Sequence, residues 1–387
     1  MILPVYKDQF LIDKNITFLN FGSFGACPKP IFDEYIRWQY VLENEPVRFI
    51  AHNAMPNLET SRKALGAFLN CHHDHLVYVP NPTYAVNIVA KNFPLRPGDE
   101  ILSTDLEYGA CDRTWNYYCR KAGATYVRQH IGIPVTSKDQ IIEQFKKGYS
   151  SKTKAIFISH ITSSTALRLP VEEICEWAKS IGLITIVDGA HVPAHIPLDL
   201  STLKADIYTG ACHKWMMTPK GSTFFYAKPE FQDMFDPLII SWGYEAAMPS
   251  HSQFLDYHQM TGTRDFSAYL TVPKAIEFLK DHNWTEVSAA CRKMVQDNYP
   301  VICDLLGTQP LCPINDDFLG QMCSTPINCP EPEKLHQLLF NEYKIEIPVF
   351  RHGDKVFIRF SVQAFNSQQD LDYLFATLKT LKTKGMF

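Results

Sequence analysis

The chain has 387 residues, with 37 Lys and Arg against 41 Asp and Glu, a formal net charge of −4 and 46 % hydrophobic residues. This balance excludes a disordered or fibrous protein, since low hydrophobicity and a large charge excess are both missing. It also argues against a nucleic-acid-binding protein, which needs a dense basic surface.

The N-terminal sequence predicts neither export nor membrane insertion. Lys7 and Asp8 interrupt the stretch that would have to be apolar in a signal peptide. Apolar runs such as residues 183–187 are far shorter than the ~20 residues of a membrane helix. The 11 cysteines are odd in number and scattered, which is typical of reduced core thiols rather than of a disulfide framework. We therefore expect a soluble cytoplasmic protein.

Short β-rich apolar runs alternate with helical stretches between residues 76 and 226. The expected strands are residues 76–79, 100–103, 124–128, 154–159, 183–187, 205–208 and 222–226. The expected helices are residues 82–92, 110–122, 138–147 and 171–181. This alternation predicts a parallel sheet covered by helices. The run at 183–188 is apolar at consecutive positions, as in a strand that is buried on both faces.

The pattern changes after residue 268. The expected helices are residues 267–281, 285–306, 331–342 and 368–382, and the expected strands are residues 318–324, 346–349 and 355–361. This mixture predicts a smaller α+β domain. We expect an N-terminal segment (residues 1–25) that packs on the small domain, a large domain (residues 26–268) and the small domain itself (residues 269–387). The segment 28–48 is expected to pack across both units.

The strongest local signal lies at residues 206–221, where His213 and Lys214 follow a predicted strand. Keeping a lysine uncharged at pH 7 requires lowering its pKa from ~10.4 by about 3 units, which costs ~4 kcal/mol. A fold tolerates this cost when the amine reacts, as in an imine with an aldehyde cofactor. The simpler interpretation is a surface lysine, and taken alone it is favoured because buried lysines are rare.

Asp188 ends a predicted buried strand and lies 26 residues before Lys214. Ligands of open α/β sheets bind at the carboxyl ends of strands. A carboxylate there can keep a pyridinium nitrogen protonated, so that the ring accepts electrons from a carbanion. His191 would lie beside the same ring. The simpler interpretations are a helix N-cap for Asp188 and a core histidine for His191.

A phosphate site is predicted where the strand at 76–79 leads through a turn into a helix. The first turn of a helix offers free N–H groups and a positive dipole end, and Thr83 adds a hydroxyl. The simpler interpretation is an ordinary N-cap.

Three segments together resemble the class V aminotransferase family of pyridoxal-phosphate enzymes: Asp188-Gly-Ala-His191, His213-Lys214-Trp215 and Thr261-Gly-Thr263-Arg-Asp265. The opening Leu19-Asn20-Phe-Gly22-Ser-Phe-Gly25 is similar to the isopenicillin-N-epimerase-like and cysteine-lyase-like branch. The resemblance covers about residues 18–361. It implies fold type I, with a mostly parallel seven-stranded sheet in the large domain. It also implies pyridoxal 5′-phosphate as the cofactor and a homodimer.

The resemblance also implies roles at matching positions around the cofactor. Lys214 would bind the aldehyde and move the Cα proton. Asp188 would bind the pyridine nitrogen, and His191 would lie near the phenolic oxygen. Tyr108 would stack on the ring. The phosphate would be held by Thr83, His213 and, from a neighbouring subunit, Thr263.

On the substrate side, the resemblance places Ser163 beside the ring and Arg359 on the substrate carboxylate. A guanidinium suits a planar carboxylate because it binds both oxygens. The simpler interpretation of Arg359 is a surface arginine at a strand end. Asn20 and Gly22 would lie on a loop that lines the substrate side.

Two departures from the family pattern stand out. Ala211 occupies a position where the family often has a hydroxyl, so one phosphate hydrogen bond is expected to be missing or replaced. Cys312, Cys323 and Cys329 do not have the spacing of a persulfide-forming cysteine, and we interpret them as inert thiols. The sequence 71–75, Cys-His-His-Asp-His, is interpreted as a polar loop, and we expect no metal site.

The resemblance favours epimerisation or C–S cleavage of an amino acid over transamination. It does not separate the first two reactions. The alternative from another class is a non-catalytic dimeric protein that keeps the fold as a scaffold or sensor. The side chain of the substrate is left open.

Overall fold

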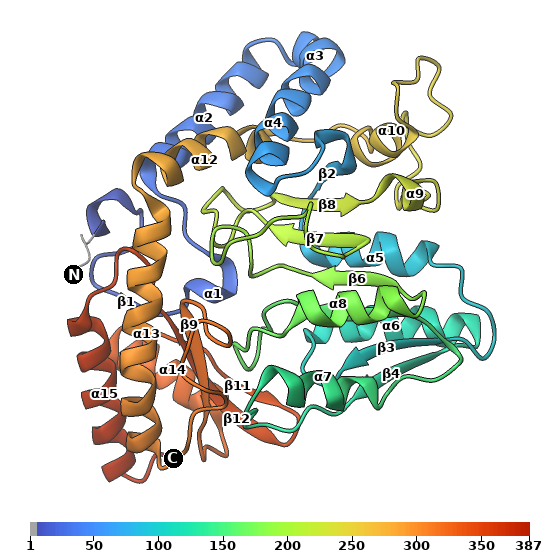
Figure 1. Ribbon diagram of the computed structural model, residues 1–387. Helices are drawn as coiled ribbons and strands as arrows, with labels where there is room; N and C mark the ends of the chain where they lie inside the picture. Colours follow the sequence, from blue (N-terminus) through green and yellow to red (C-terminus); the bar gives the residue numbers. More distant parts are fainter. Residues whose placement is uncertain (1–5) are drawn as a thin grey trace.

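A computed structural model describes residues 6–387, and its centre is a seven-stranded sheet in the order β2-β8-β7-β6-β5-β3-β4 (Figure 1). The strands are β2 (Leu76–Val79), β3 (Glu100–Thr104), β4 (Thr125–Gln129), β5 (Thr153–Ser159), β6 (Ile184–Asp188), β7 (Ile207–Ala211) and β8 (Thr223–Ala227). Only β8 runs against the other six strands. The predicted α/β architecture with a mostly parallel seven-stranded sheet is therefore confirmed.

Consecutive apolar residues in the strands face two different hydrophobic cores. On β5, Ile156 and Ile158 belong to the larger core, whereas Phe157 between them belongs to the smaller one. Successive side chains of a strand point to opposite faces, so a strand covered on both sides is apolar at every position.

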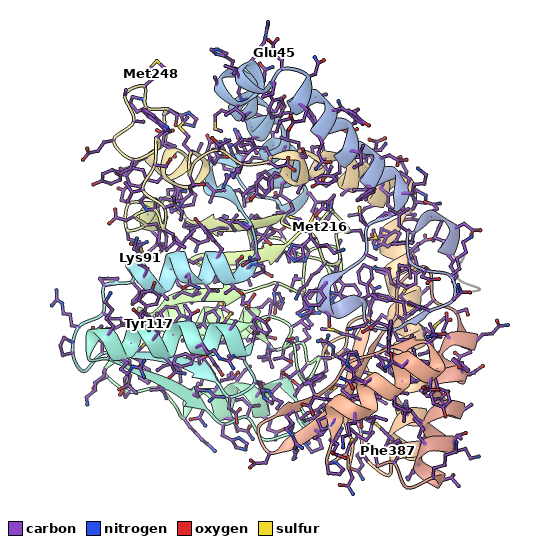
Figure 2. All side chains as sticks on the ribbon, turned by 180° about the vertical axis from the view of Figure 1, so that it is seen from behind. Glu45, Lys91, Tyr117, Met216, Met248 and Phe387 are labelled. Carbon is purple, nitrogen blue, oxygen red and sulfur yellow. The ribbon has the colours of Figure 1, made fainter. Side chains whose placement is uncertain are left out.

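Helices cover both faces of the sheet. They are α5 (Pro82–Asn92), α6 (Gly109–Ala122), α7 (Lys138–Lys146) and α8 (Val171–Ser180). Figure 2, seen from behind, shows α5 with Lys91 and α6 with Tyr117 lying over one face. The four predicted helices between residues 82 and 181 are confirmed to within one or two residues.

Several predicted elements are shifted or divided. The strand expected at 346–349 is divided between the end of β10 (Ile345–Glu346) and the start of β11 (Val349–His352). The expected helix 267–281 is α11 (Ser267–Leu270) and α12 (Val272–Asp281). Pro273 causes this break, since proline cannot donate the backbone hydrogen bond of a continuous helix. The strand expected at 205–208 is β7, which begins only at Ile207 because the preceding Asp206 is held by hydrogen bonds and ion pairs of its side chain. Its carboxylate binds Thr185, Lys179 and Lys228.

The C-terminal part contains a three-stranded antiparallel sheet in the order β11-β12-β9. The strands are β9 (Met322–Pro326), β11 (Val349–His352) and β12 (Lys355–Ser361). Its helices are α13 (Trp284–Leu306), α14 (Pro332–Tyr343) and α15 (Gln368–Thr383). The strand predicted at 318–324 begins later, at Met322, because the Asp316 and Phe318 carbonyls accept hydrogen bonds from Arg168 and the Gln321 N–H donates to His195.

The N-terminal segment lies against this C-terminal part. Strand β1 (Thr17–Phe18) pairs with β10 (Ile345–Glu346), and the Tyr6 N–H donates to the Ala364 carbonyl. The first five residues of the segment predicted over 1–25 lie outside the described residues. The division into three parts stays a prediction.

The remaining helices are two longer ones, α2 and α4, and several short ones. They are α1 (Phe21–Phe24), α2 (Lys29–Asn44), α3 (Pro46–Arg48), α4 (Ala54–Leu69), α9 (Pro229–Gln232), α10 (Gln253–Gln259), and the single turns η1 (Lys7–Gln9), η2 (Phe49–Asn53) and η3 (His73–His75). None of the helices within residues 6–387 is both long and apolar enough to cross a bilayer.

Candidate active site

The predicted site residues gather where the parallel strands end. Glu107 and Tyr108 follow β3, Asp188 ends β6, and His213 and Lys214 follow β7. Because β3, β6 and β7 run in the same direction, their carboxyl ends meet at one edge of the sheet. This edge is where open α/β sheets bind their ligands.

A chain of hydrogen bonds links Lys214, His191 and Trp215. The indole Nε1 of Trp215 lies 3.3 Å from His191 Nδ1, and Lys214 Nζ lies 3.1 Å from His191 Nε2. An indole N–H can only donate, so His191 Nδ1 must be the acceptor. The proton of the neutral imidazole is therefore on Nε2 and points to the Lys214 amine. An amine accepts that proton only when it is uncharged.

Burial lowers the pKa of both Lys214 and His191. Burial is the main cause that lowers the pKa of Lys214 to about 8, with the Asp188 charge opposing it and Arg359 reinforcing it. Burial, reinforced by Lys214 and Arg359, holds the pKa of His191 well below its ordinary value. A neutral histidine and a partly uncharged lysine at pH 7 agree with the hydrogen bonds.

Asp188 is a buried carboxylate that forms no ion pair within the described chain. Its Oδ1 accepts the Ala190 N–H at 2.9 Å, and its Oδ2 is 3.6 Å from Cys111 Sγ, a weak donor. Burial raises the pKa of Asp188, whereas Ala190 and Lys214 oppose that rise. The carboxylate thus keeps acceptor capacity for a cationic N–H group such as a pyridinium.

The residues predicted for a phosphate lie on neighbouring elements. Thr83 is in the first turn of α5, whose N-cap Asn81 accepts the Tyr84 N–H at 2.8 Å. His213 Nδ1 donates to the Ser222 carbonyl at 2.8 Å, which leaves Nε2 as an acceptor in the neutral ring. Burial lowers the pKa of His213 to about 4. His213 can donate to a phosphate only after a nearby anion has raised this pKa.

Arg359 is 4 % exposed and has no carboxylate partner among residues 6–387. Its Nη1 donates to the Ser163 carbonyl at 2.5 Å, and its Nη2 donates to Ser23 Oγ at 3.0 Å. Burial lowers the pKa of Arg359 to about 10. A buried guanidinium that is held only by neutral groups is a ready site for an anionic ligand. The interpretation of Arg359 as a surface arginine is wrong.

A cleft of about 720 Å³ lies between the edge of the sheet and the β11–β12 hairpin. Arg359, Ser163, Ser23 and Tyr108 all line it, and Tyr108 is 47 % exposed. The structure therefore brings the predicted ring-stacking residue and the predicted carboxylate-binding residue into one cavity.

The loop with Asn20 and Gly22 packs against site residues from two separate parts of the chain. A Cβ on Gly22 would lie 2.9 Å from Met322 Sδ and 3.5 Å from Arg359 Nη2. Gly25 has a φ of +66°, and a Cβ there would lie 2.7 Å from the Lys214 carbonyl oxygen. Asn20 binds Glu346 and accepts a hydrogen bond from Ser23. This loop touches the backbone of Lys214 at one end and Arg359 at the other.

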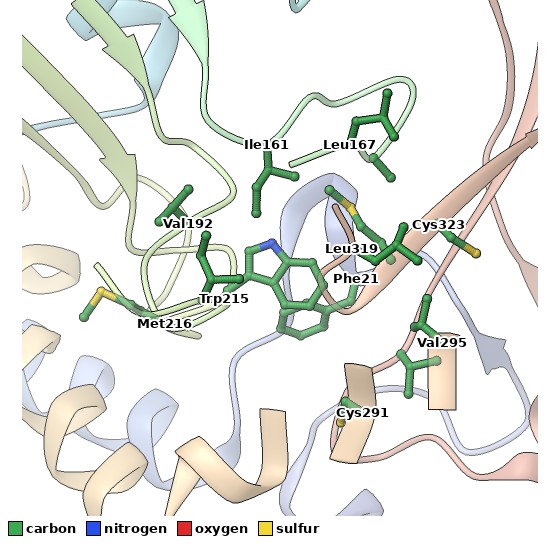
Figure 3. Packing of buried hydrophobic residues seen from close by; sticks show 14 of the residues in the cluster. Phe21, Ile161, Leu167, Val192, Trp215, Met216, Cys291, Val295, Leu319 and Cys323 are labelled. Atoms are coloured by element: carbon green, nitrogen blue, oxygen red, sulfur yellow. The ribbon is translucent and has the colours of Figure 1, made fainter. Parts of the chain in front are cut away.

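The turn that carries His191 rests on a buried aromatic cluster, in which Trp215 lies next to Phe21, Ile161 and Val192 (Figure 3). His195 stacks on Trp215 with ring centroids 3.8 Å apart. Its Nδ1 donates to the His191 carbonyl, and its Nε2 accepts the Gln321 N–H. Burial lowers the pKa of His195 to about 3, so the ring stays neutral and fixes the turn.

Thr263 and the candidate metal residues lie elsewhere. Thr263 is exposed in the loop after α10. The ligand atoms of His72, His73 and Asp74 lie within 4.8 Å of one another, but Asp74 already binds Arg62 and His251. Cys312, Cys323 and Cys329 are buried free thiols. The predicted roles of the site residues stay predictions.

Sequence reasoning missed four residues of this site. Trp215 fixes the proton on His191, Ser23 binds Arg359, and Glu107 and Cys111 lie beneath the edge that carries Asp188. Ser23 and Trp215 stand inside motifs that the sequence analysis quoted. Glu107 and Cys111 carry no such signal, because their role depends on contacts between separate strands.

Comparisons with known proteins identify the family and the fold. The model of the Aminotransferase class-V family matches residues 32–374. Isopenicillin N epimerase of Amycolatopsis lactamdurans is 30 % identical, over 97 % of each chain. Putative L-cysteine desulfhydrase 1 of Oryza sativa subsp. japonica is 26 % identical, over 96 % of this chain and 84 % of the relative.

Solved structures with low sequence identity share the fold. A C-DES mutant with glycine covalently linked to its PLP cofactor has a TM-score of 0.83 at 20 % identity, covering 96 % of this chain and 98 % of that one. The apo structure of a cysteine desulfurase from Thermococcus onnurineus NA1 has a TM-score of 0.82 at 19 % identity, covering 97 % and 98 %.

Proposed function

Because the chain belongs to the class-V aminotransferase family, we propose that it is a pyridoxal-phosphate enzyme that acts at the Cα of an amino acid. The reaction is epimerisation or C–S cleavage. The observation that carries this proposal is the Trp215–His191–Lys214 chain, in which the buried His191 ring contacts a lysine amine whose pKa is lowered to about 8.

Two groups fit pyridoxal phosphate, and a third fits the carboxylate of its substrate. Within residues 6–387, Asp188 is a buried carboxylate without an ion-pair partner, and Lys214 is an amine whose pKa is lowered to about 8. Arg359 is a buried cation without an anion among the same residues. Asp188 would hold the ring nitrogen, and the Nε2 proton of His191 would bind the phenolic oxygen. Thr83 and a protonated His213 would hold the phosphate, and Tyr108 would cover the ring.

The bound cofactor supplies an aldehyde that condenses with amines and a pyridinium ring that accepts electrons from the Cα–H bond. Arg359 holds the substrate carboxylate in a fixed orientation, with Ser163 and Ser23 fixing the guanidinium. Lys214, once released, takes the proton from Cα, and its pKa of about 8 suits a base that works near neutral pH. Asn20 and Gly22 act on the substrate side through Arg359: Gly22 leaves room beside the guanidinium, and Asn20 accepts a hydrogen bond from Ser23, which binds Arg359.

The names of the relatives support the two favoured reactions. They comprise isopenicillin N epimerases and cysteine desulfhydrases, and transamination is the less favoured alternative. A non-catalytic scaffold would have no use for a buried Arg359 without an anion, because such a group lowers stability.

The experiment that tests the function is an absorbance titration of the protein reconstituted with pyridoxal phosphate, followed by a product screen. We expect a visible band that shifts on adding an amino acid, and then release of sulfide and pyruvate or inversion at Cα. A band that no amino acid shifts would favour the scaffold. A protein that cannot be reconstituted would overturn the cofactor assignment.

We also propose a homodimer in the cytoplasm. The segment between α9 and α10 exposes large apolar side chains, among them Trp242 at 85 % and Met248 at 88 % exposure, and such side chains are typical of an interface. Thr263 lies in the neighbouring loop, from which it would reach the partner's phosphate. The 11 free cysteines support a reducing compartment.

Mixing two inactive variants tests the shared phosphate site. Thr263→Ala should weaken cofactor binding by about 10–100-fold, since a hydrogen bond to a charged group is worth ~1.5–3 kcal/mol. When Thr263→Ala subunits are mixed with Lys214→Ala subunits, they should form heterodimers. One of the two sites in such a heterodimer has Lys214 from one subunit and Thr263 from the other. We expect the mixture to recover cofactor binding and activity. A monomer by analytical ultracentrifugation, or no recovery on mixing, would contradict the proposal.

A further inference from the structure

Strand β12 presents a row of three side chains to the cleft beside the site. Arg359, Phe357 and Lys355 alternate along the strand, and all three line the cleft. Alternate residues of a strand point to the same face, and at about 3.4 Å per residue the two cations start roughly 14 Å apart. The row therefore leads away from Arg359, the residue proposed to hold the substrate carboxylate, to a second cation.

The β11–β12 hairpin holds this row in place. Phe350 pairs with Phe357 across the hairpin, and their ring centroids are 6.4 Å apart. His352 pairs with Lys355, and its Nε2 donates to the Asp105 carbonyl at 3.1 Å. This hydrogen bond ties the end of the hairpin to the segment after β3. The middle of the row is thus aromatic, and its far end is anchored to the large sheet.

The charges around the cleft favour an anionic ligand. Among residues 6–387, its acids Asp105 and Asp112 pair with His130 at 2.6 Å and Arg128 at 3.2 Å. The cations of the cleft that form no ion pair within the same residues are Arg113, Arg351, Lys355 and Arg359. The acids that form none are Glu107, which binds Thr104 and Ser159, and Asp354 in the hairpin turn. An excess of free cations in a cleft attracts anions.

The cleft is larger than a short amino acid needs. Its volume of about 720 Å³ falls in the range of roughly 300–1,000 Å³ that is typical of pockets for drug-sized ligands. Lys214, Asp188 and His191 do not line it, so the cleft lies beside the proposed place of the cofactor ring. Its space is therefore open to the side chain of the substrate.

We propose that the substrate is an amino acid with a long side chain that ends in a second carboxylate. Arg359 binds the α-carboxylate, Phe350 and Phe357 contact the middle of the side chain, and Lys355 binds the distal carboxylate. The side chains of alanine and cysteine are too short to reach Lys355. This assignment rests on the proposed function, because it places the reacting end of the substrate at Arg359.

A pair of amino acids of equal length tests the distal carboxylate. The side chain of 2-aminopimelate ends in a carboxylate, and that of 2-aminoheptanoate ends in a methyl group. Both are titrated into the protein reconstituted with pyridoxal phosphate, and the shift of the visible band is followed. At low salt, 2-aminopimelate should half-saturate the shift at an about fivefold lower concentration, the upper end for an exposed ion pair. This preference should shrink as salt is added.

Three variants assign the preference to Lys355. Lys355→Glu should make 2-aminopimelate bind more weakly than 2-aminoheptanoate, because like charges then meet, and Lys355→Arg should keep the wild-type preference. Lys379→Glu is the matched control, since Lys379 is exposed on α15 and does not line the cleft. It should keep the preference, and all three variants should bind 2-aminoheptanoate as wild type does.

Two outcomes would overturn the proposal and leave the proposed function intact. They are equal half-saturation by the two amino acids in wild type, and a preference for 2-aminopimelate that survives in Lys355→Glu. If no amino acid shifts the band, the function fails. Calorimetry with pimelate and heptanoate, which lack the amine, then decides the question without the cofactor. We expect pimelate to bind more tightly and to lose this advantage in Lys355→Glu, whereas equal binding in wild type would exclude the distal site.

Discussion

Lys214→Ala should abolish the visible absorption band that appears when the wild-type protein is reconstituted with pyridoxal phosphate. The amine is the group that condenses with the aldehyde and the base that removes the Cα proton. Losing the proton transfer alone costs about 10²–10⁴-fold in rate. Absorbance spectra and steady-state rates on the same preparation measure both effects.

Lys220→Ala is the matched control for this experiment. Lys220 is partly buried in the same segment and donates to the Gly25 carbonyl, but it makes no contact with His191. Lys220→Ala should keep the band, and both variants should unfold near the wild-type temperature. A Lys214→Ala protein with an unchanged spectrum would mean that another lysine binds the cofactor.

The depressed pKa of Lys214 gives this prediction a pH dependence. The free protein holds the amine protonated below about pH 8 and uncharged above it. The rate of cofactor attachment should therefore rise with pH and level off above that value. A rate that is flat between pH 6 and pH 9 would contradict the assignment of the uncharged form.

Arg359→Ala should weaken recognition of the amino-acid carboxylate by about 2–5 kcal/mol, the scale for truncating one partner of a buried charge pair. This corresponds to about 30- to 4,000-fold in KM or in the concentration that shifts the visible band. Arg359→Lys should recover only part of the loss, since an ammonium cannot bind both oxygens in the planar geometry of a guanidinium.

The stability of Arg359→Ala separates a functional arginine from a structural one. In the chain without substrate, Arg359 is buried and bonded only to neutral groups of Ser163 and Ser23. Removing it therefore relieves a desolvated charge and should leave the free energy of unfolding unchanged or higher. Strong destabilisation together with an unchanged amino-acid response would place the carboxylate at another residue.

The fold was largely predictable because the central sheet depends on local patterns. The run at 183–187 has apolar residues at consecutive positions, and neighbouring Ile186 and Val187 of β6 indeed belong to two different cores, so the strand is covered on both faces. The strand boundaries that were predicted wrongly are those set by tertiary contacts. Asp206 binds Thr185 and two lysines, so β7 begins only after it. Residues 316 and 318 bind Arg168 and Gln321 binds His195, so β9 begins only at Met322.

The site shows the same division. Lys214, Asp188 and His191 could be found in the sequence because each stands in a short motif at a strand end. Which nitrogen of His191 carries the proton could not be predicted, because this depends on a hydrogen bond from Trp215, 24 residues further along the chain. Glu107 and Cys111 could not either, since their positions matter only after β3, β5 and β6 have paired in that order.

The sequence by itself determined the family, the sheet and the reactive lysine, because periodicity and short motifs are read along the chain. Only the tertiary structure decided which of these groups are charged. Charge depends on burial and on partners from distant segments. Among residues 6–387, Arg359 is buried without an anion and Asp188 without a cation, and the Lys214 amine lies against His191 Nε2.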